Sequence, residues 1–464
     1  MPSLRDLVPV PMRRVAVVAP ISGFRRVAVE VADRGTFEPD RRPDAPPGAT
    51  AAILDRLDPG DACARLSPTP EDPERLAAAG AFDLLLGEAS LEERTAAARD
   101  IGRCRALPGW MRDDDLGPAR ETLAPLGAAV VDLPGRRGLT PPTAHAPGRT
   151  GDAFRPLVTT YAVVPYRDVD PTVFAAVAYL VMFGMMFGDV AHGLAIVALG
   201  AAATWIRSPL WRRLRPAGPF LLGAGVAATA FGFLYGEAFG PTGLVPTLWM
   251  RPLDEPETLL VAGLVLGAIL LAITFAIATV DRWREGGPAA ALYEPSGIAG
   301  SLLLLGAAGL ALGWVTDPGW PTTAGWVAAG AGAVLVLIGL VAESGGRPAG
   351  LARALIELFD TVLRLGSNIV SFTRLAAFGL THAVITEVVW EGTTAWWDRG
   401  TPVTMVAAVV LFVAGNAAAF GLGALVAAIQ ALRLEYYELF SRLFVSSGRP
   451  FDPWHVPIAR REES

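Results

Sequence analysis

Long apolar runs dominate residues 172–433 and restrict how this chain can fold. A helix needs about 20 mostly apolar residues to cross a bilayer, and most of these runs reach that length. The composition agrees, because 52% of the residues are hydrophobic and only 18% are charged. We therefore expect a polytopic, all-α membrane domain. The runs lie at about 172–206, 218–240, 258–280, 296–315, 323–342, 355–390 and 403–432.

The N-terminal third differs, because it is rich in Arg, Asp, Glu and Pro. A short apolar run followed by a helical pattern, which Gly35 ends as a C-cap, is typical of the start of a βαβ unit. We expect residues 1–165 to form a small cytoplasmic α/β domain with its linker, 166–445 the membrane domain and 446–464 a cytoplasmic tail. The expected elements are strands at Arg14–Pro20, Thr36–Pro39 and Ala128–Leu133, a helix at Gly23–Asp33, one or two helices within 71–106, and a linker at Pro134–Asp152.

Loop charges suggest a topology. The loop after the first apolar run carries four arginines, and such loops stay on the cytoplasmic side of a membrane. With a cytoplasmic N-terminus, this requires the first run to be a tight pair of short helices. The chain then has about eight spans and both termini in the cytoplasm. The arginines are Arg207, Arg212, Arg213 and Arg215, and the expected break is at Gly188, Asp189 and Gly193.

The chain contains no lysine. This excludes a P-loop phosphate site, a Schiff-base lysine and a lysine general base. Any ATP must therefore bind to another subunit, and we expect no cofactor here. Cys63 and Cys104 lack the spacing of a metal site and are expected to be reduced thiols. No patch for nucleic acid is present in the sequence.

An arginine interrupts the run at 355–390, within SNIVSFTRLAAFGLTH. At about 100° per residue, Ser371, Ser367 and Asp360 share the helix face of Arg374. His382 and its neighbour Thr381 fall on the same side. This face forms a polar stripe in an otherwise apolar segment.

Such an arginine costs at least about 2.5–3.5 kcal/mol in mid-bilayer and keeps its charge. Arg374 therefore needs an aqueous path or a partner anion. Asp189 and Glu237 are candidate partners. The plainer alternative is a structural salt bridge within the membrane.

The last apolar run has its own polar members, which are Asn416, Gln430, Arg433, Glu435 and Glu438. Taken alone, Arg433 is best explained as a positive-inside anchor near the cytoplasmic surface. A pair of arginines on adjacent helices suggests something more directed, in which two fixed positive charges face one moving anion.

Four ordered motifs now carry a resemblance: FGMMFGDVAHG at 183–193, FLYGEAFG at 233–240, SNIVSFTRLAAFGLTHA at 367–383, and ALRLEYYELFSRLF followed by GRPFDPW at 431–454. Together they resemble the membrane subunit of V-type and A-type rotary ATPases, called subunit a in eukaryotes and subunit I in prokaryotes. The N-terminal RRVAVVAPISGFRRVAVEVADRGTFEP is similar to the start of that family. The resemblance implies an eight-helix membrane domain with two long tilted C-terminal helices.

The resemblance also implies roles for individual residues. Arg374 matches the essential arginine that meets a rotor-ring carboxylate, and Arg433 matches the second membrane arginine. The ion half-channels would be lined by residues from four helices, although packing of Gly, Met and Phe explains much of the first two motifs. The implied lining residues are Asp360, Ser367, Ser371, His382, Asp189, His192, Glu237 and Glu435.

A non-catalytic stator subunit is thus implied, in the plasma membrane of a prokaryote. Its expected partners are a proteolipid rotor ring, stalk subunits, lipid, and a transported H⁺ or Na⁺. One feature departs from the family, because only about 165 residues precede the first span and no sustained heptad pattern marks a long stator arm. Two alternatives remain: an ion-coupled secondary transporter that reuses this fold without ATP, and a membrane scaffold in which Arg374 is only salt-bridged.

Overall fold

The computed structural model describes residues 9–42, 48–57, 59–134, 139–144, 153–212, 214–315, 319–343, 348–444 and 447–459. These residues fall into two compact units, one made of 9–144 with 448–459 and the other of 153–447. Arg213, most of the predicted linker at Pro134–Asp152 and residues 460–464 of the predicted tail lie outside the described ranges.

A five-stranded antiparallel sheet forms the centre of the first unit. Its strands are β1 (Met12–Pro20), β2 (Phe37–Pro39), β3 (Arg99–Ile101), β4 (Cys104–Arg112) and β5 (Ala129–Asp132). The strand order is β2-β4-β1-β5, with β3 paired to β4. Because β1 and β2 are both antiparallel to β4, they run in the same direction with β4 between them. The predicted βαβ start is therefore present in a split form.

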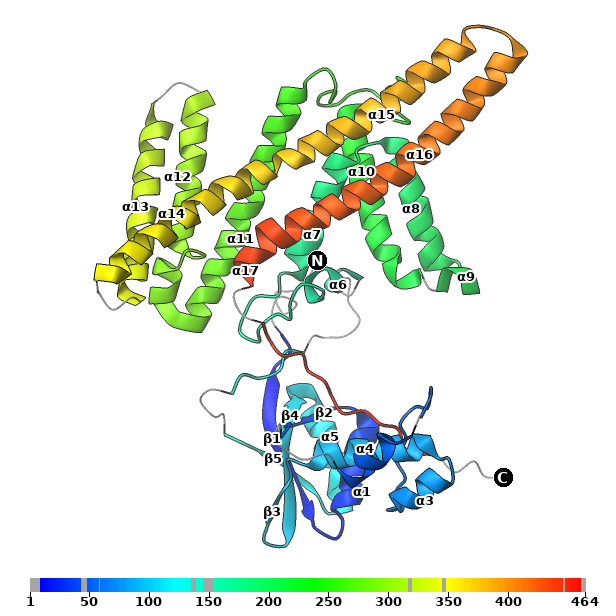
Figure 1. Cartoon of the computed structure of the whole chain (residues 1–464), viewed down its shortest axis with the longest axis vertical. Helices are drawn as coiled ribbons and strands as arrows, with labels where there is room; N and C mark the ends of the chain where they lie inside the picture. Colours follow the sequence, from blue (N-terminus) through cyan, green and yellow to red (C-terminus); the bar gives the residue numbers. More distant parts are fainter. Residues whose placement is uncertain are drawn as a thin grey trace. The chain divides into compact units, whose positions relative to one another are not determined.

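Short helices complete this unit (Figure 1). They are α1 (Phe24–Arg34), α2 (Ala49–Leu54), α3 (Pro73–Ala78), α4 (Phe82–Thr95) and α5 (Leu116–Leu123), with single 3-10 turns at Asp113–Asp115 and Ala124–Leu126. The prediction that α1 ends at Gly35 is confirmed, because Gly35 has left-handed backbone with φ of 59°. The prediction of helices throughout 71–106 is wrong at its end. There the chain turns at Gly102 and forms β3 and β4, because pairing of β4 with β1 and β2 outweighs the weak local helical pattern.

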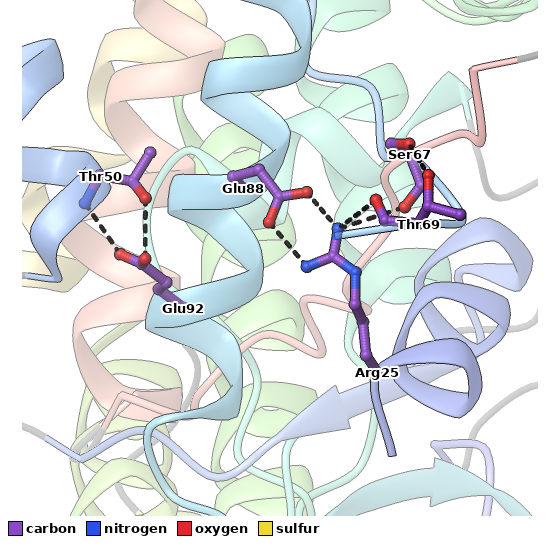
Figure 2. Close-up of polar contacts among 6 residues, drawn as sticks. All are labelled: Arg25, Thr50, Ser67, Thr69, Glu88 and Glu92. Atoms are coloured by element: carbon purple, nitrogen blue, oxygen red, sulfur yellow. Dashed lines mark hydrogen bonds and ion pairs between the residues drawn. The ribbon is translucent and has the colours of Figure 1, made fainter. Parts of the chain in front are cut away.

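Two carboxylates on α4 join it to its neighbours (Figure 2). Glu88 is buried and accepts a hydrogen bond from Nη1 of Arg25 on α1 at 2.8 Å. The same guanidinium donates to the backbone oxygens of Ser67 and Thr69, at 3.3 Å each. Glu92, one turn further along α4, accepts from the N–H and hydroxyl of Thr50 in α2. These contacts fix α1, α2 and α4 together.

Residues 448–459 belong to this unit although they come after the membrane helices in sequence. Trp454 is only 2% exposed, its Nε1 donates to Ser90 Oγ at 3.0 Å, and its backbone N–H donates to the carbonyl of Phe37. Asp452 forms ion pairs with Arg41 and Arg94. The end of the chain thus contributes to the core that its beginning forms.

The second unit is helical (Figure 1). Its helices are α6 (Arg155–Thr159), α7 (Thr172–Met186), α8 (Val190–Trp205), α9 (Pro209–Arg212), α10 (Gly218–Tyr235), α11 (Pro256–Tyr293), α12 (Ile298–Val315), α13 (Trp320–Glu343), α14 (Pro348–Ser371), α15 (Thr373–Trp397), α16 (Pro402–Leu434) and α17 (Ser441–Leu443). A 3-10 turn at Arg215–Ala217 and a π-helix at Glu435–Phe440 complete the set.

Within the described ranges, five helical segments are long and apolar enough to cross a membrane. They correspond to α10, α11, α13, the joined pair α14 and α15, and α16 with its extension. The last two segments are 48 and 42 residues long and cross the other helices obliquely in Figure 1. Val406, Val410 and Val413 on α16 are each more than half exposed, which suits contact with lipid.

The first apolar run divides as predicted, because α7 ends at Met186 and α8 begins at Val190. Asp189 caps α8 by accepting a hydrogen bond from the N–H of His192. Gly193, which was also expected at the break, lies inside α8 instead. A Cβ atom there would fall 2.5 Å from the backbone nitrogen of Thr229 on α10, so glycine allows these two helices to approach closely.

Candidate functional site

The helix that carries Arg374 is broken immediately before it. α14 ends at Ser371 and α15 begins at Thr373, with Phe372 between them. The N–H of Phe372 bonds to the carbonyl of Ile369, and its own carbonyl accepts from the N–H of Leu375. Both bonds span three residues, as in a tight 3-10 turn. Arg374 therefore lies in the first turn of a new helix.

Arg374 and Ser371 face a carboxylate from another helix. Nη2 of Arg374 donates to the Ser371 hydroxyl, and that hydroxyl donates to Oε1 of Glu438. The Nη2 and Oε1 atoms are 3.9 Å apart. With its amide nitrogen turned toward this carboxylate, Asn368 donates to Oε2 of Glu438 at 3.1 Å. Glu438 thus accepts from two side chains and partly balances the charge of Arg374.

One donor of this arginine stays free. Nη1 of Arg374 is buried and has no hydrogen-bond partner among the described residues. A guanidinium has five N–H donors and no acceptor, so this group can take an additional anion without breaking its contact with Ser371. The side chain as a whole is 22% exposed, although Nη1 itself is buried.

A π-helix positions Glu438 and its neighbour Glu435. α16 ends at Leu434 and continues as the π-helix Glu435–Phe440. Such insertions shift the following side chains around the helix axis and are frequent at functional sites. Glu435 is fully buried, and neither of its carboxylate oxygens has a partner in the described part of the chain. Glu438, which the sequence did not single out as a site residue, is the carboxylate that contacts Arg374.

The second arginine lies near the first. Arg433 is exposed in the last turn of α16, and its charge interacts with that of Arg374. Arg442 on α17 is a further cation at this end, and its charge interacts with those of Asp360 and Glu438. Nothing in the sequence separated Arg442 from the other arginines at the end of the chain.

Asp360 and Ser367, the predicted stripe residues furthest before Arg374, do not join its network. Asp360 forms an ion pair with Arg364, one turn further along α14, at 2.6 Å, and Ser367 is exposed. At about 1.5 Å per residue, Asp360 and Ser367 lie roughly 20 and 10 Å from Arg374 along the helix axis. Ser371, three residues before Arg374, is close enough to contact it.

A second cluster of the predicted residues lies where α8, α15 and α16 meet. Asp189 Oδ1 is 3.7 Å from Nδ1 of His192, and the ring of His192 is 5.6 Å from that of His382. Asn416 on α16 lies close enough to His192 to interact with its ring. All four residues are buried, with 5% or less of each exposed.

The two expected partner anions of Arg374 belong to this second cluster. Asp189 uses Oδ1 to cap α8 and Oδ2 to accept from the N–H of Gly240 at 3.0 Å. The carbonyl of Glu237 accepts from the N–H of Val190 at 2.9 Å. The FGD and YGE motifs are therefore joined through their backbones. This packing role was the plainer interpretation of both motifs.

Comparisons with known proteins find relatives for part of this chain. A sequence model of the V-type ATPase 116kDa subunit family matches residues 119–241, which include the FGMMFGDVAHG and FLYGEAFG motifs. The chain is similar to A-type ATP synthase subunit I of Archaeoglobus fulgidus, with 27% identity over 65% of this chain and 51% of the relative.

Other relatives extend the match. A-type ATP synthase subunit I of Aeropyrum pernix is 28% identical over 81% of this chain and 58% of its own length. V-type ATP synthase subunit I 2 of Treponema pallidum is 33% identical over 26% of each chain. The chain spans about half the length of the curated relatives that it matches.

Proposed function

Because the chain belongs to the V-type ATPase 116kDa subunit family, together with subunit I of A-type ATP synthases, we propose that it is the static membrane subunit of a rotary ATPase. In this role it passes ions to and from carboxylates on a rotating ring. The ion-translocating part would be residues 166–445. The chain holds no lysine for a P-loop, so ATP would bind to another subunit.

The free Nη1 donor of Arg374 carries this proposal. A ring carboxylate that faces lipid must be neutral, because an ion in hydrocarbon is costly. When it reaches Arg374, a permanent positive charge favours the ionised carboxylate and expels its proton or sodium ion. Glu438 and Ser371 hold the guanidinium in place between such encounters. Arginine suits this task because it stays charged where a buried lysine can deprotonate.

The two clusters suit two offset half-channels. Ser371, which donates to Glu438, lies three residues before Arg374, while His382 lies eight residues beyond it on α15. At about 1.5 Å per residue, His382 is roughly 12 Å further along the helix. We assign the cluster around His382 to one half-channel and the cluster around Glu438, with Asp360, Ser367 and Glu435, to the other. Arg374 between them would block a direct leak.

The same proposal extends to the topology. The five long candidates, together with the three shorter apolar helices α7, α8 and α12, would give eight spans. The positive loop after α8 then lies in the cytoplasm with both termini. The partners would be a proteolipid ring and the stalk subunits of the complex. The transported ion would be H⁺ or Na⁺, and each elementary charge that crosses 100 mV would exchange about 2.3 kcal/mol.

Purification of the tagged chain from its native membrane in mild detergent tests this assignment. We expect mass spectrometry to identify a proteolipid ring with ATPase head and stalk subunits. If the chain is isolated alone, or with a partner that lacks nucleotide-binding subunits, the assignment fails. That result would favour an ion-coupled transporter that uses this membrane fold without ATP.

A further inference from the structure

The cluster of buried side chains at the junction of α8, α15 and α16 has the composition of a transition-metal site. Ligand atoms of Asp189, His192 and His382 all lie within 4.8 Å of one another, and all three residues are buried. Two imidazoles and one carboxylate form a common ligand set for zinc. Imidazole nitrogens favour such metals over Na⁺, which prefers oxygen ligands.

The orphaned polar atoms point to a ligand. No hydrogen bond of normal geometry reaches either ring nitrogen of His192 or of His382 in the described part of the chain. The amide oxygen of Asn416 is likewise without a partner there. A buried polar atom that lacks a hydrogen bond costs about 1–3 kcal/mol. One bound cation would satisfy several of these atoms at once.

The geometry needs little adjustment. With metal–ligand bonds of about 2.0–2.1 Å, tetrahedral ligand atoms are separated by roughly 3.3 Å. The 3.7 Å between Asp189 Oδ1 and His192 Nδ1 is already near that value. His382 would need a side-chain rotation to move its nitrogen closer. Among the described residues, each carboxylate oxygen of Asp189 accepts one backbone hydrogen bond, so lone pairs remain for a metal.

Charge and surroundings also suit a divalent ion. Glu237 is a second buried carboxyl group close to Asp189, and a bound cation would favour the ionised forms of both. The ring of Phe187 lies 4.6 Å from that of His382 and 5.8 Å from that of His192. Phe239 and Phe420 also pack against His192. This apolar shell excludes water and strengthens metal–ligand contacts.

We propose that Asp189, His192 and His382 bind one divalent transition metal of the zinc class, with Asn416 as a fourth ligand. The metal would join α8, α15 and α16 at one point. The same cluster is assigned above to one half-channel, so a bound metal would occupy that ion path. Metal binding is measured on the isolated chain, without a rotor ring or ATP, so failure of this proposal and failure of the proposed function are distinguishable.

Metal binding to the purified full-length chain in detergent tests the site. The wild type is stripped with a chelator, dialysed and titrated with ZnCl₂ in buffer that contains NaCl. We expect one tightly bound zinc per chain and a rise in Tm with added zinc. Asp189→Asn, His192→Gln and His382→Gln should each bind at least about tenfold more weakly. Asn is as good a helix cap as Asp, so Asp189→Asn keeps the bond from the N–H of His192 at the start of α8, while it loses the acceptor for the N–H of Gly240.

Matched controls exclude general effects. His455→Gln changes an exposed histidine in the other unit, and Asp168→Asn changes a buried carboxylate away from the cluster. Both should bind zinc as the wild type does. Co²⁺ added to the wild type should give the visible absorption of a cobalt site with nitrogen ligands. This measurement uses the wild type alone and so does not depend on whether a variant folds. The proposal would be overturned if the wild type showed neither saturable zinc binding nor this absorption. It would also be overturned if all three ligand variants bound zinc as tightly as the wild type does.

Discussion

The Nη2 atom of Arg374 and the Oε1 atom of Glu438 lie 3.9 Å apart, and the hydroxyl of Ser371 is hydrogen-bonded to both side chains. The two charged residues come from different helical segments, α15 and the π-helix that follows α16. This contact balances part of the arginine's charge while Nη1 stays free. Arg374 is therefore both held by the chain and able to bind another anion.

Replacing Glu438 with glutamine tests the holding role. Glu438→Gln removes the negative charge but keeps an acceptor for Ser371, so the guanidinium loses its compensating charge. We expect ATP-driven ion transport in reconstituted vesicles to fall several-fold. Loss of one member of a buried pair costs about 3–5 kcal/mol, and partial exposure makes the cost here smaller.

The control for this variant is Glu357→Gln on α14. Glu357 pairs with the exposed Arg353, so its loss should leave transport near the wild-type rate. Equal transport by Glu438→Gln and the wild type would show that Glu438 does not support Arg374.

The two arginines are expected to differ in importance. The side chain of Arg433 is exposed, whereas that of Arg374 contacts Ser371 and Glu438. Arg433→Ala should therefore reduce transport less than Arg374→Ala does. Initial rates of ion uptake at equal protein content measure this. The ranking is incorrect if both variants lose transport to the same extent.

The C-terminal segment should stabilise the N-terminal unit. Trp454 is 2% exposed in the core of that unit, and truncation of such a side chain costs about 3–5 kcal/mol. We expect Trp454→Ala to increase hydrogen exchange in β2 and α4, which contact this residue through Phe37 and Ser90. His455→Ala, at an exposed position, should change exchange little. Unchanged protection in Trp454→Ala would contradict a shared core.

A pH dependence follows from Asp168, which precedes α7. Burial, and then repulsion from Asp281 and Glu285, raises the pKa of Asp168 to about 7 from the usual 3.8. A carboxyl group with a higher pKa in the folded state binds its proton more tightly there. Its contribution to stability is therefore complete below about pH 4 and is lost as the pH rises through about 7.

Asp168→Asn removes this ionisable group. Relative to the wild type, the variant should gain stability as the pH is raised from 4 to 8, by at most roughly 4 kcal/mol. Tm values of both proteins across this range provide the measurement. A difference in Tm that does not change with pH would mean that Asp168 titrates normally.

Much of the local structure was predictable from the sequence, because helix ends and breaks are determined by particular residue types at those positions. Gly35 marks the end of α1, and the polar and glycine residues near Asp189 mark the division between α7 and α8. The β3–β4 hairpin was missed because strand pairing over a distance, rather than local periodicity, determines it. Inclusion of Trp454 in the N-terminal core depends on contacts between sequence-distant segments for the same reason.

At the candidate site, the sequence predicted Arg374, Ser371, Asp189, His192 and His382, but not which of these residues contact one another. Ser371, three residues before Arg374, contacts it, whereas Ser367 and Asp360 are seven and fourteen residues away along the helix. The partner of Arg374 was missed because a π-helix, which no simple periodicity reveals, directs Glu438 inward. Asp189, His192 and His382 come together because the start of α8 lies close to α15, and local sequence patterns do not reveal this tertiary contact.

Arg374→Lys in the reconstituted complex tests the central claim most directly. Lysine keeps a positive charge in water but can lose it when buried. It also lacks the forked guanidinium, in which one nitrogen binds Ser371 and a second nitrogen stays free. We predict that the variant inserts and assembles, but that ATP-driven ion transport into vesicles is abolished. Coupled transport at a rate near that of the wild type would contradict the role assigned to Arg374.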